Sequence, residues 1–146
     1  MAKILIATHG YLAQGVKNTI HLLIGENVSI QCICAYVDES NLEEKIAAFM
    51  HELLPQEQAL IFTDINGGSI NQKILFYREK KNVFIISGFN LSLVLELILL
   101  KEQLTPTIIN KKIQMCREQM VLVNELSFES LESDEDFFQE RKLDND

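Results

Sequence analysis

The strongest constraint on the fold is the alternation of short apolar runs with longer segments in which apolar residues recur at helical spacing. The apolar runs are typical of strands buried on both faces, and they lie at 3–8, 29–37, 59–63, 83–87 and 120–123. The helical segments lie at 11–24, 40–54, 69–80, 91–100 and 106–119. This order predicts an α/β protein with a doubly wound, mostly parallel sheet. Ser40 and Glu43 have the spacing of a capping box, which predicts that the second helix begins at Ser40.

Length and charge predict one domain followed by an acidic tail. The chain has 146 residues, the usual size of a single domain, and we expect that domain to span 1–124. Residues 125–146 hold nine acidic and two basic residues, so most of the net charge of −8 lies in this tail. Phe137 and Phe138 leave open whether part of the tail docks on the domain. The domain lacks the basic patch that a nucleic-acid surface needs.

Other classes of protein are disfavoured by simple counts. No apolar run approaches the 18 residues of a spanning helix, and the N-terminus does not resemble a secretory signal, so we expect a cytoplasmic protein. Three cysteines without a secretory signal argue against a disulfide framework. No cluster of histidines and cysteines supplies a metal site, and we expect no metal and no cofactor.

Two polar residues follow two of the predicted strands directly. His9 comes after the first strand, in IATHGY, and Asp64 comes after the third. Ligands of doubly wound sheets bind beyond the carboxyl ends of the strands, at a switch point. If the strand order is 2-1-3-4, the first and third strands are neighbours, and His9 and Asp64 lie side by side. A carboxylate at one ring nitrogen would fix the tautomer and leave the other nitrogen free to attack.

A glycine turn next to these residues predicts an anion site. Gly67 and Gly68 allow a tight turn, and Ser69 adds a hydroxyl where the next helix starts. With His9 and Asp64, this set suits phosphoryl transfer onto and off a ring nitrogen. A serine hydrolase using Ser69, His9 and Asp64 remains an alternative, although Gly-Gly-Ser-Ile-Asn lacks the last glycine of a nucleophile elbow. A structural histidine and a simple N-cap serine are the plain alternatives.

Three segments resemble the motif regions of a known family. ATHGYLAQGV, FTDINGGSIN and ISGFNLSLVLEL are similar, in order and spacing, to the mannose-family enzyme IIA of the bacterial phosphoenolpyruvate:sugar phosphotransferase system. The resemblance covers 1 to about 123. It departs from the usual pattern at Asn66, Ile70 and Ser92, and these changes bear on partner and sugar specificity.

The resemblance implies a function, partners and an assembly. His9 would accept a phosphoryl group from the phosphocarrier protein HPr and pass it to enzyme IIB during sugar uptake. Asp64 would orient the ring, and Gly67, Gly68 and Ser69 would receive the phosphoryl oxygens. The membrane components would be reached only indirectly. The family fold has strand order 2-1-3-4 with a short antiparallel fifth edge strand exchanged in a homodimer, and 120–123 would be that strand.

Two further alternatives share the phosphorylated histidine. One is a regulatory module that senses phosphorylation and reports sugar flux to a partner. The other is the phosphocarrier domain of dihydroxyacetone kinase systems. Transfer of the phosphoryl group from the phosphorylated protein to a IIB domain would distinguish a transport component from a regulatory module.

Overall fold

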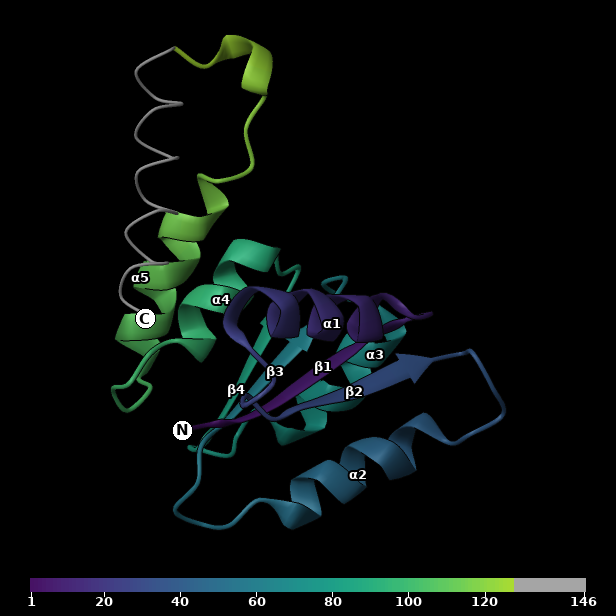
Figure 1. Cartoon of the computed structure of the whole chain (residues 1–146). Coiled ribbons are helices and arrows are strands. Elements are labelled where there is room, and N and C mark those ends of the chain that lie inside the picture. The colour runs from purple at the N-terminus through teal and green to yellow at the C-terminus, as the bar shows by residue number, and fades with distance from the viewer. Residues whose placement is uncertain (128–146) are drawn as a thin grey trace.

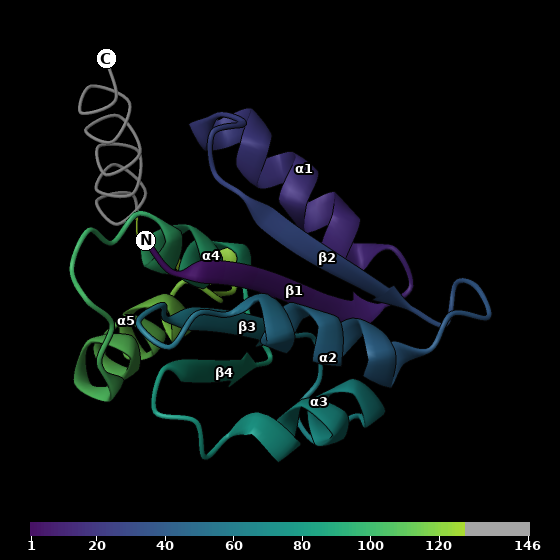
Figure 2. The same cartoon turned by 90° about the horizontal axis from the view of Figure 1, so that it is seen from below.

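The computed structural model describes residues 1–127, so the predictions about the acidic tail beyond that point lie outside it. Four strands form one sheet in the order β2-β1-β3-β4, and every pairing is parallel (Figure 2). The strands are β1 (Lys3–His9), β2 (Ile30–Ala35), β3 (Ala59–Thr63) and β4 (Val83–Ser87). The α-helices are α1 (Leu12–Ile24), α2 (Leu42–Glu52), α3 (Ser69–Ile74), α4 (Leu91–Ile98) and α5 (Pro106–Arg117). This is the predicted fold class and strand order.

Helices cover both faces of the sheet because alternate side chains of each strand point to opposite sides. Ile4 and Ile6 of β1 belong to a cluster with residues of α1, α4 and α5, whereas Leu5 and Ala7 belong to a cluster with residues of α2 and α3. Figure 1 shows α1 and α4 on one side of the sheet and α2 on the other. Burial on both faces explains why the strands read as continuous apolar runs.

Two predicted helix boundaries differ from the observed ones. The second helix is capped by Asn41, whose side chain accepts the Glu44 N–H, while Ser40 hydrogen-bonds Asp38. The prediction that Ser40 is the cap is therefore wrong, because the adjacent asparagine takes that role. Helix α3 ends at Ile74 and tightens into a 3₁₀ turn, Leu75–Tyr77, since 78–82 are all polar and offer nothing to pack on the sheet.

The predicted fifth strand at 120–123 is not formed within the described chain. Met120 is 81% exposed, and a 3₁₀ turn, Val123–Glu125, follows it. Figure 1 shows the chain after α5 leading away from the sheet. These apolar residues therefore have no strand partner among residues 1–127, and an exchange between two copies stays a prediction. Within 1–127, no helix combines the length and apolar character needed to cross a membrane.

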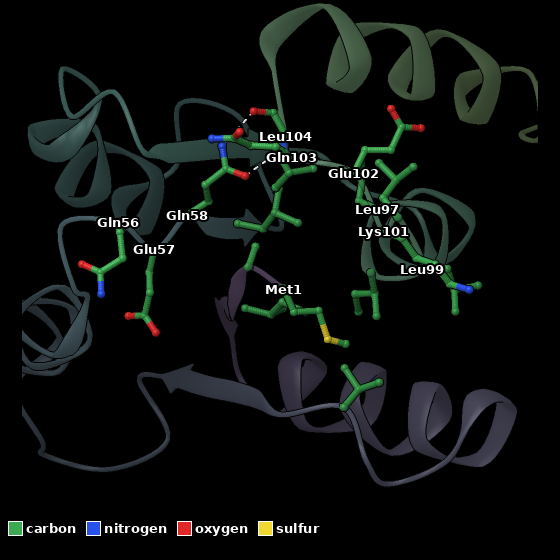
Figure 3. Close-up of a pocket in the computed structure, with 16 residues that line it drawn as sticks. Met1, Gln56, Glu57, Gln58, Leu97, Leu99, Lys101, Glu102, Gln103 and Leu104 are labelled. Atoms are coloured by element: carbon green, nitrogen blue, oxygen red, sulfur yellow. Dashed lines mark hydrogen bonds between the residues drawn. The ribbon is translucent and has the colours of Figure 1, made fainter.

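A hollow separate from His9 lies at the amino ends of the strands. It has a volume of about 960 Å³ and is lined by the start of β1, the end of α4 and the loop that follows α4. Figure 3 shows its side chains, with Gln58 in two hydrogen bonds of 2.8 Å to the backbone of Leu104. His9 ends β1 at the opposite edge, so this hollow is separate from the candidate site.

Candidate functional site

His9 is the last residue of the strand that lies between β2 and β3. It pairs in register with Ala35, the last residue of β2. Gly10 follows with φ +58°, a left-handed conformation that glycine adopts without steric cost, and its N–H donates to the Ala35 carbonyl. The strand therefore ends abruptly at His9, which leaves the imidazole at the carboxyl edge of the sheet with a side chain 40% exposed.

Asp64 follows the neighbouring strand and holds His9 at two points. Its Oδ2 accepts the His9 backbone N–H at 2.9 Å and lies 2.9 Å from the ring Nδ1. Its Oδ1 accepts the Ile65 backbone N–H at 3.0 Å. A carboxylate can only accept hydrogen bonds, so Nδ1 carries the proton and a neutral ring keeps its lone pair on Nε2. The predicted contact between His9 and Asp64 is present.

Opposing effects act on the pKa of the Asp64 carboxyl. The side chain is only 11% exposed, and this burial by itself raises the pKa. The hydrogen bonds from the backbone and ring of His9, together with the charge of the ring, outweigh burial and bring the pKa below its ordinary value. Asp64 is therefore ionised at neutral pH, as an acceptor for Nδ1–H must be.

The glycine turn lies against the ring. Gly67 has φ +75°, so the turn requires a residue that tolerates the left-handed region. At Gly68 a Cβ would lie 3.2 Å from the Ile65 carbonyl oxygen and 3.7 Å from His9 Cε1. Ser69 begins α3 directly afterwards. The five predicted residues, His9, Asp64, Gly67, Gly68 and Ser69, are thus brought together at one edge of the sheet.

Tyr36 is a site residue that the sequence analysis missed. It follows Ala35, the register partner of His9, and its ring centroid lies 5.6 Å from that of His9 with a 32° tilt. Its hydroxyl lies 2.7 Å from Ser69 Oγ. Tyr36 has φ +65°, which ends β2 at Ala35 rather than at residue 37 as predicted. Only the strand register could have signalled its place.

The three departures from the family pattern have different surroundings in the structure. Ile70 is fully buried in the core cluster under α2 and α3, so it packs the fold and does not face the ring. Asn66 accepts a long hydrogen bond of 3.5 Å from Asn71, which is itself buried beside Thr63. Ser92 lies in the first turn of α4, after the Asn90 cap.

Among residues 1–127, the other histidines and the acidic residues form no second centre. His21 Nε2 lies 2.9 Å from the Val28 carbonyl oxygen, a contact that joins α1 to the start of β2. His51 is exposed on α2. Between residues 1 and 127, no group of three or more His, Cys, Asp or Glu is placed to hold a metal ion.

Comparisons with known proteins agree on one family. Residues 3–114 match the family model of the phosphotransferase system (PTS) fructose IIA component, named EIIA-man, which covers most of the chain. The protein is therefore a PTS IIA component of the mannose and fructose family. No curated protein matches the chain.

Solved structures share this fold. A candidate phosphoenolpyruvate-dependent sugar PTS permease from Klebsiella pneumoniae subsp. pneumoniae MGH 78578 is 28% identical with a TM-score of 0.79, over 85% of this chain and 92% of that one. The PTS IIA protein associated with the fucose utilization operon of Streptococcus pneumoniae is 24% identical with a TM-score of 0.71, over 86% and 98%. The mannose/sorbose-specific IIA subunit from Enterococcus faecalis is 17% identical with a TM-score of 0.72, over 87% and 98%. The last two likenesses concern the fold alone.

The Asp64 contact makes stability depend on pH. Asp64→Asn should lower the free energy of unfolding at pH 7 by about 1–3 kcal/mol, because hydrogen bonds to a charged acceptor are lost. Since the folded-state pKa lies below the unfolded value of about 3.9, the wild-type advantage is complete above that value. It is lost as the pH falls through the folded-state pKa.

Urea unfolding of both proteins between pH 7 and pH 3 measures this dependence. Glu79→Gln, at an exposed carboxylate on the far side of the 3₁₀ turn, controls for the loss of one negative charge. An advantage of wild type over Asp64→Asn that stays constant across the whole range would contradict the ionised contact.

Proposed function

We propose that the protein is a phosphocarrier that accepts a phosphoryl group from HPr on His9 and passes it to enzyme IIB during sugar uptake. The observation that carries this proposal is the ring of His9, whose Nδ1 is held by Asp64 while Nε2 remains available at an exposed edge. Membership of the IIA family supplies the reaction class. We place the reaction in the cytoplasm, within a carrier domain of residues 1–124 that the acidic tail follows.

Nε2 of His9 is the nucleophile in this proposal. Its lone pair attacks phosphorus in the phosphohistidine of HPr, a new N–P bond forms, and the electron pair of the broken N–P bond returns to the HPr ring. The proton on Nδ1 stays in place, and the carboxylate of Asp64 stabilises the positive charge that develops on the ring. Transfer to IIB repeats the displacement with His9 as the leaving group, so no cofactor or metal is required.

Gly67, Gly68 and Ser69 are the proposed phosphate-binding residues. Gly68 borders the Cε1 edge of the ring, which lies between the occupied Nδ1 and the free Nε2, and Gly67 and Ser69 flank Gly68 in the chain. Helix α3 has only six residues, so the proposal does not rest on a helix dipole. It rests on the backbone of the turn and the hydroxyl of Ser69, which lie where the phosphoryl oxygens would arrive.

The carrier is favoured over the serine hydrolase by the partner of Ser69. The Ser69 hydroxyl contacts the Tyr36 hydroxyl. His9, whose Nδ1 contacts the Asp64 carboxylate, belongs to a chain of a phosphotransfer family. The regulatory module and the dihydroxyacetone kinase type share the same phosphorylated His9. Discharge of the phosphorylated protein by a IIB domain is the outcome that assigns it to transport.

We also propose that two copies form a dimer by exchanging 120–123. β4 is one of the two edge strands of the sheet, and a hollow of about 500 Å³ lies along it and α5. Ser87 at the end of β4 has a buried Oγ without a hydrogen-bond partner among residues 1–127. Exposed apolar residues at 120–123 of a second copy would pair with this edge and cover the hollow.

Phosphorylation tests the site assignment. With enzyme I, HPr and phosphoenolpyruvate, wild type should gain one acid-labile phosphoryl group on His9, and His9→Ala should gain none because the nucleophile is lost. Mass spectrometry at alkaline pH maps the modified residue. His21→Ala serves as the matched control and should be labelled like wild type. Full labelling of His9→Ala would contradict the assignment.

Oligomeric state tests the exchange. Wild type should sediment as a dimer, whereas Val121→Asp combined with Val123→Asp should sediment as a monomer, because two charges would enter one face of the paired strand. Leu22→Asp, at an exposed apolar residue of α1, is the control and should remain dimeric. A monomeric wild type at about 50 μM, a concentration at which a dimer with a Kd near 1 μM is formed, would contradict the exchange.

A further inference from the structure

Tyr36 occupies a backbone conformation that a tyrosine does not adopt without cost. Its φ of +65° lies in the left-handed region, which costs a residue with a Cβ roughly 1–2 kcal/mol. The side chain is 62% exposed, so burial of its ring in the core does not repay that cost. Backbone strain of this kind clusters at functional sites, so the contacts of the Tyr36 side chain are of interest.

The hydroxyl of Tyr36 forms a directional pair with the hydroxyl of Ser69. The two oxygens are 2.7 Å apart, the usual length for a hydrogen bond between hydroxyl groups. Either hydroxyl can donate in this contact, and we take Tyr36 as the donor and Ser69 Oγ as the acceptor because a phenol is more acidic than an alkyl hydroxyl. The proton of Ser69 is then free to donate to a third group.

Tyr36 and the glycine turn also lie beside the ring of His9. The Tyr36 ring lies 5.6 Å from the imidazole, within the range of aromatic pairs, and Gly68 borders the imidazole at Cε1. Ser69 follows Gly68 at the start of α3, and its Oγ contacts the hydroxyl of Tyr36, whose ring lies beside His9. A phosphoryl group on Nε2 would present its oxygens on this side.

We propose that Tyr36 is a positioning residue of the phosphoryl site, which donates to Ser69 Oγ and thereby directs the Ser69 proton toward a phosphoryl oxygen on His9. This inference rests on the proposed phosphorylation of His9. Tyr36 acts through Ser69 and does not itself contact the reacting atoms. A chain of two hydroxyls also polarises the terminal donor, which strengthens its hydrogen bond to the anionic phosphoryl oxygens.

Phosphoramidate tests the proposal without a protein partner. In this reaction Nε2 of His9 attacks the phosphorus of phosphoramidate, the new N–P bond forms, and ammonia leaves with the electron pair of the broken bond. The rate of His9 labelling is followed by peptide mapping, so that labels on His21 and His51 are counted separately. The variants are Tyr36→Phe, Ser69→Ala and the two combined.

We expect that the effects of Tyr36→Phe and Ser69→Ala on the rate of His9 labelling do not add. Tyr36→Phe should slow His9 labelling by about fivefold, the fold-change that one neutral hydrogen bond supports. Ser69→Ala should slow it at least as much. The double variant should be no slower than Ser69→Ala alone, because Tyr36 has no route to the phosphoryl group once the serine hydroxyl is gone.

A second variant separates positioning from a structural role. Tyr36→Gly suits the left-handed backbone, so its melting temperature should equal or exceed that of wild type while labelling of His9 slows as in Tyr36→Phe. Tyr77→Phe removes a hydroxyl from another tyrosine, away from His9, and should label at the wild-type rate.

Three results would overturn the proposal. The first is wild-type labelling in Tyr36→Phe, and the second is a slowing by Tyr36→Phe that is equally large in the Ser69→Ala background. The third is a His9 that phosphoramidate does not modify; labelling from HPr decides separately whether the proposed function also fails. If phosphoramidate labels His9 with the expected pattern but HPr does not, the proposed function fails while the role of Tyr36 stands.

Discussion

The contact between Asp64 and His9 is the interaction on which the site depends. One carboxylate oxygen accepts both the backbone N–H and the ring Nδ1–H of His9, so it fixes the position of the residue and the tautomer of its ring together. Burial of the carboxylate would favour its neutral form, and the hydrogen bonds from His9 keep it ionised. A histidine that merely ended a strand would need neither constraint, so the contact favours a chemical role for the ring.

The sheet supplies this contact through its topology. With the order β2-β1-β3-β4, β1 has a neighbour on each side: β2 ends at Ala35, the partner of His9, and β3 ends at Thr63, the partner of Ala7. β3 is followed by Asp64, and β2 is followed by Tyr36, whose hydroxyl reaches Ser69 after the glycine turn. Three segments far apart in sequence therefore contribute to one edge, at the switch point where doubly wound sheets bind their ligands.

Much of this arrangement could be predicted from the sequence. The runs at 59–63 and 83–87 match β3 and β4 residue for residue, because parallel strands covered by helices on both faces are largely apolar. The pairing of His9 with Asp64 followed from strand order and polar residues at strand ends. Tyr36 could not be found in this way, since its role depends on a left-handed backbone and on register. The sequence also could not show where the run at 120–123 would pair, because apolar composition does not reveal whether a partner strand belongs to the same chain.

The tautomer of His9 tests the account most directly. The ¹⁵N chemical shifts of its ring, measured in the wild-type protein at a pH where the ring is neutral, report which nitrogen carries the proton. We predict a protonated Nδ1 and an unprotonated Nε2, as the 2.9 Å contact between Nδ1 and Asp64 requires. A proton on Nε2 would contradict the account, because the nitrogen assigned to receive the phosphoryl group would then have no free lone pair.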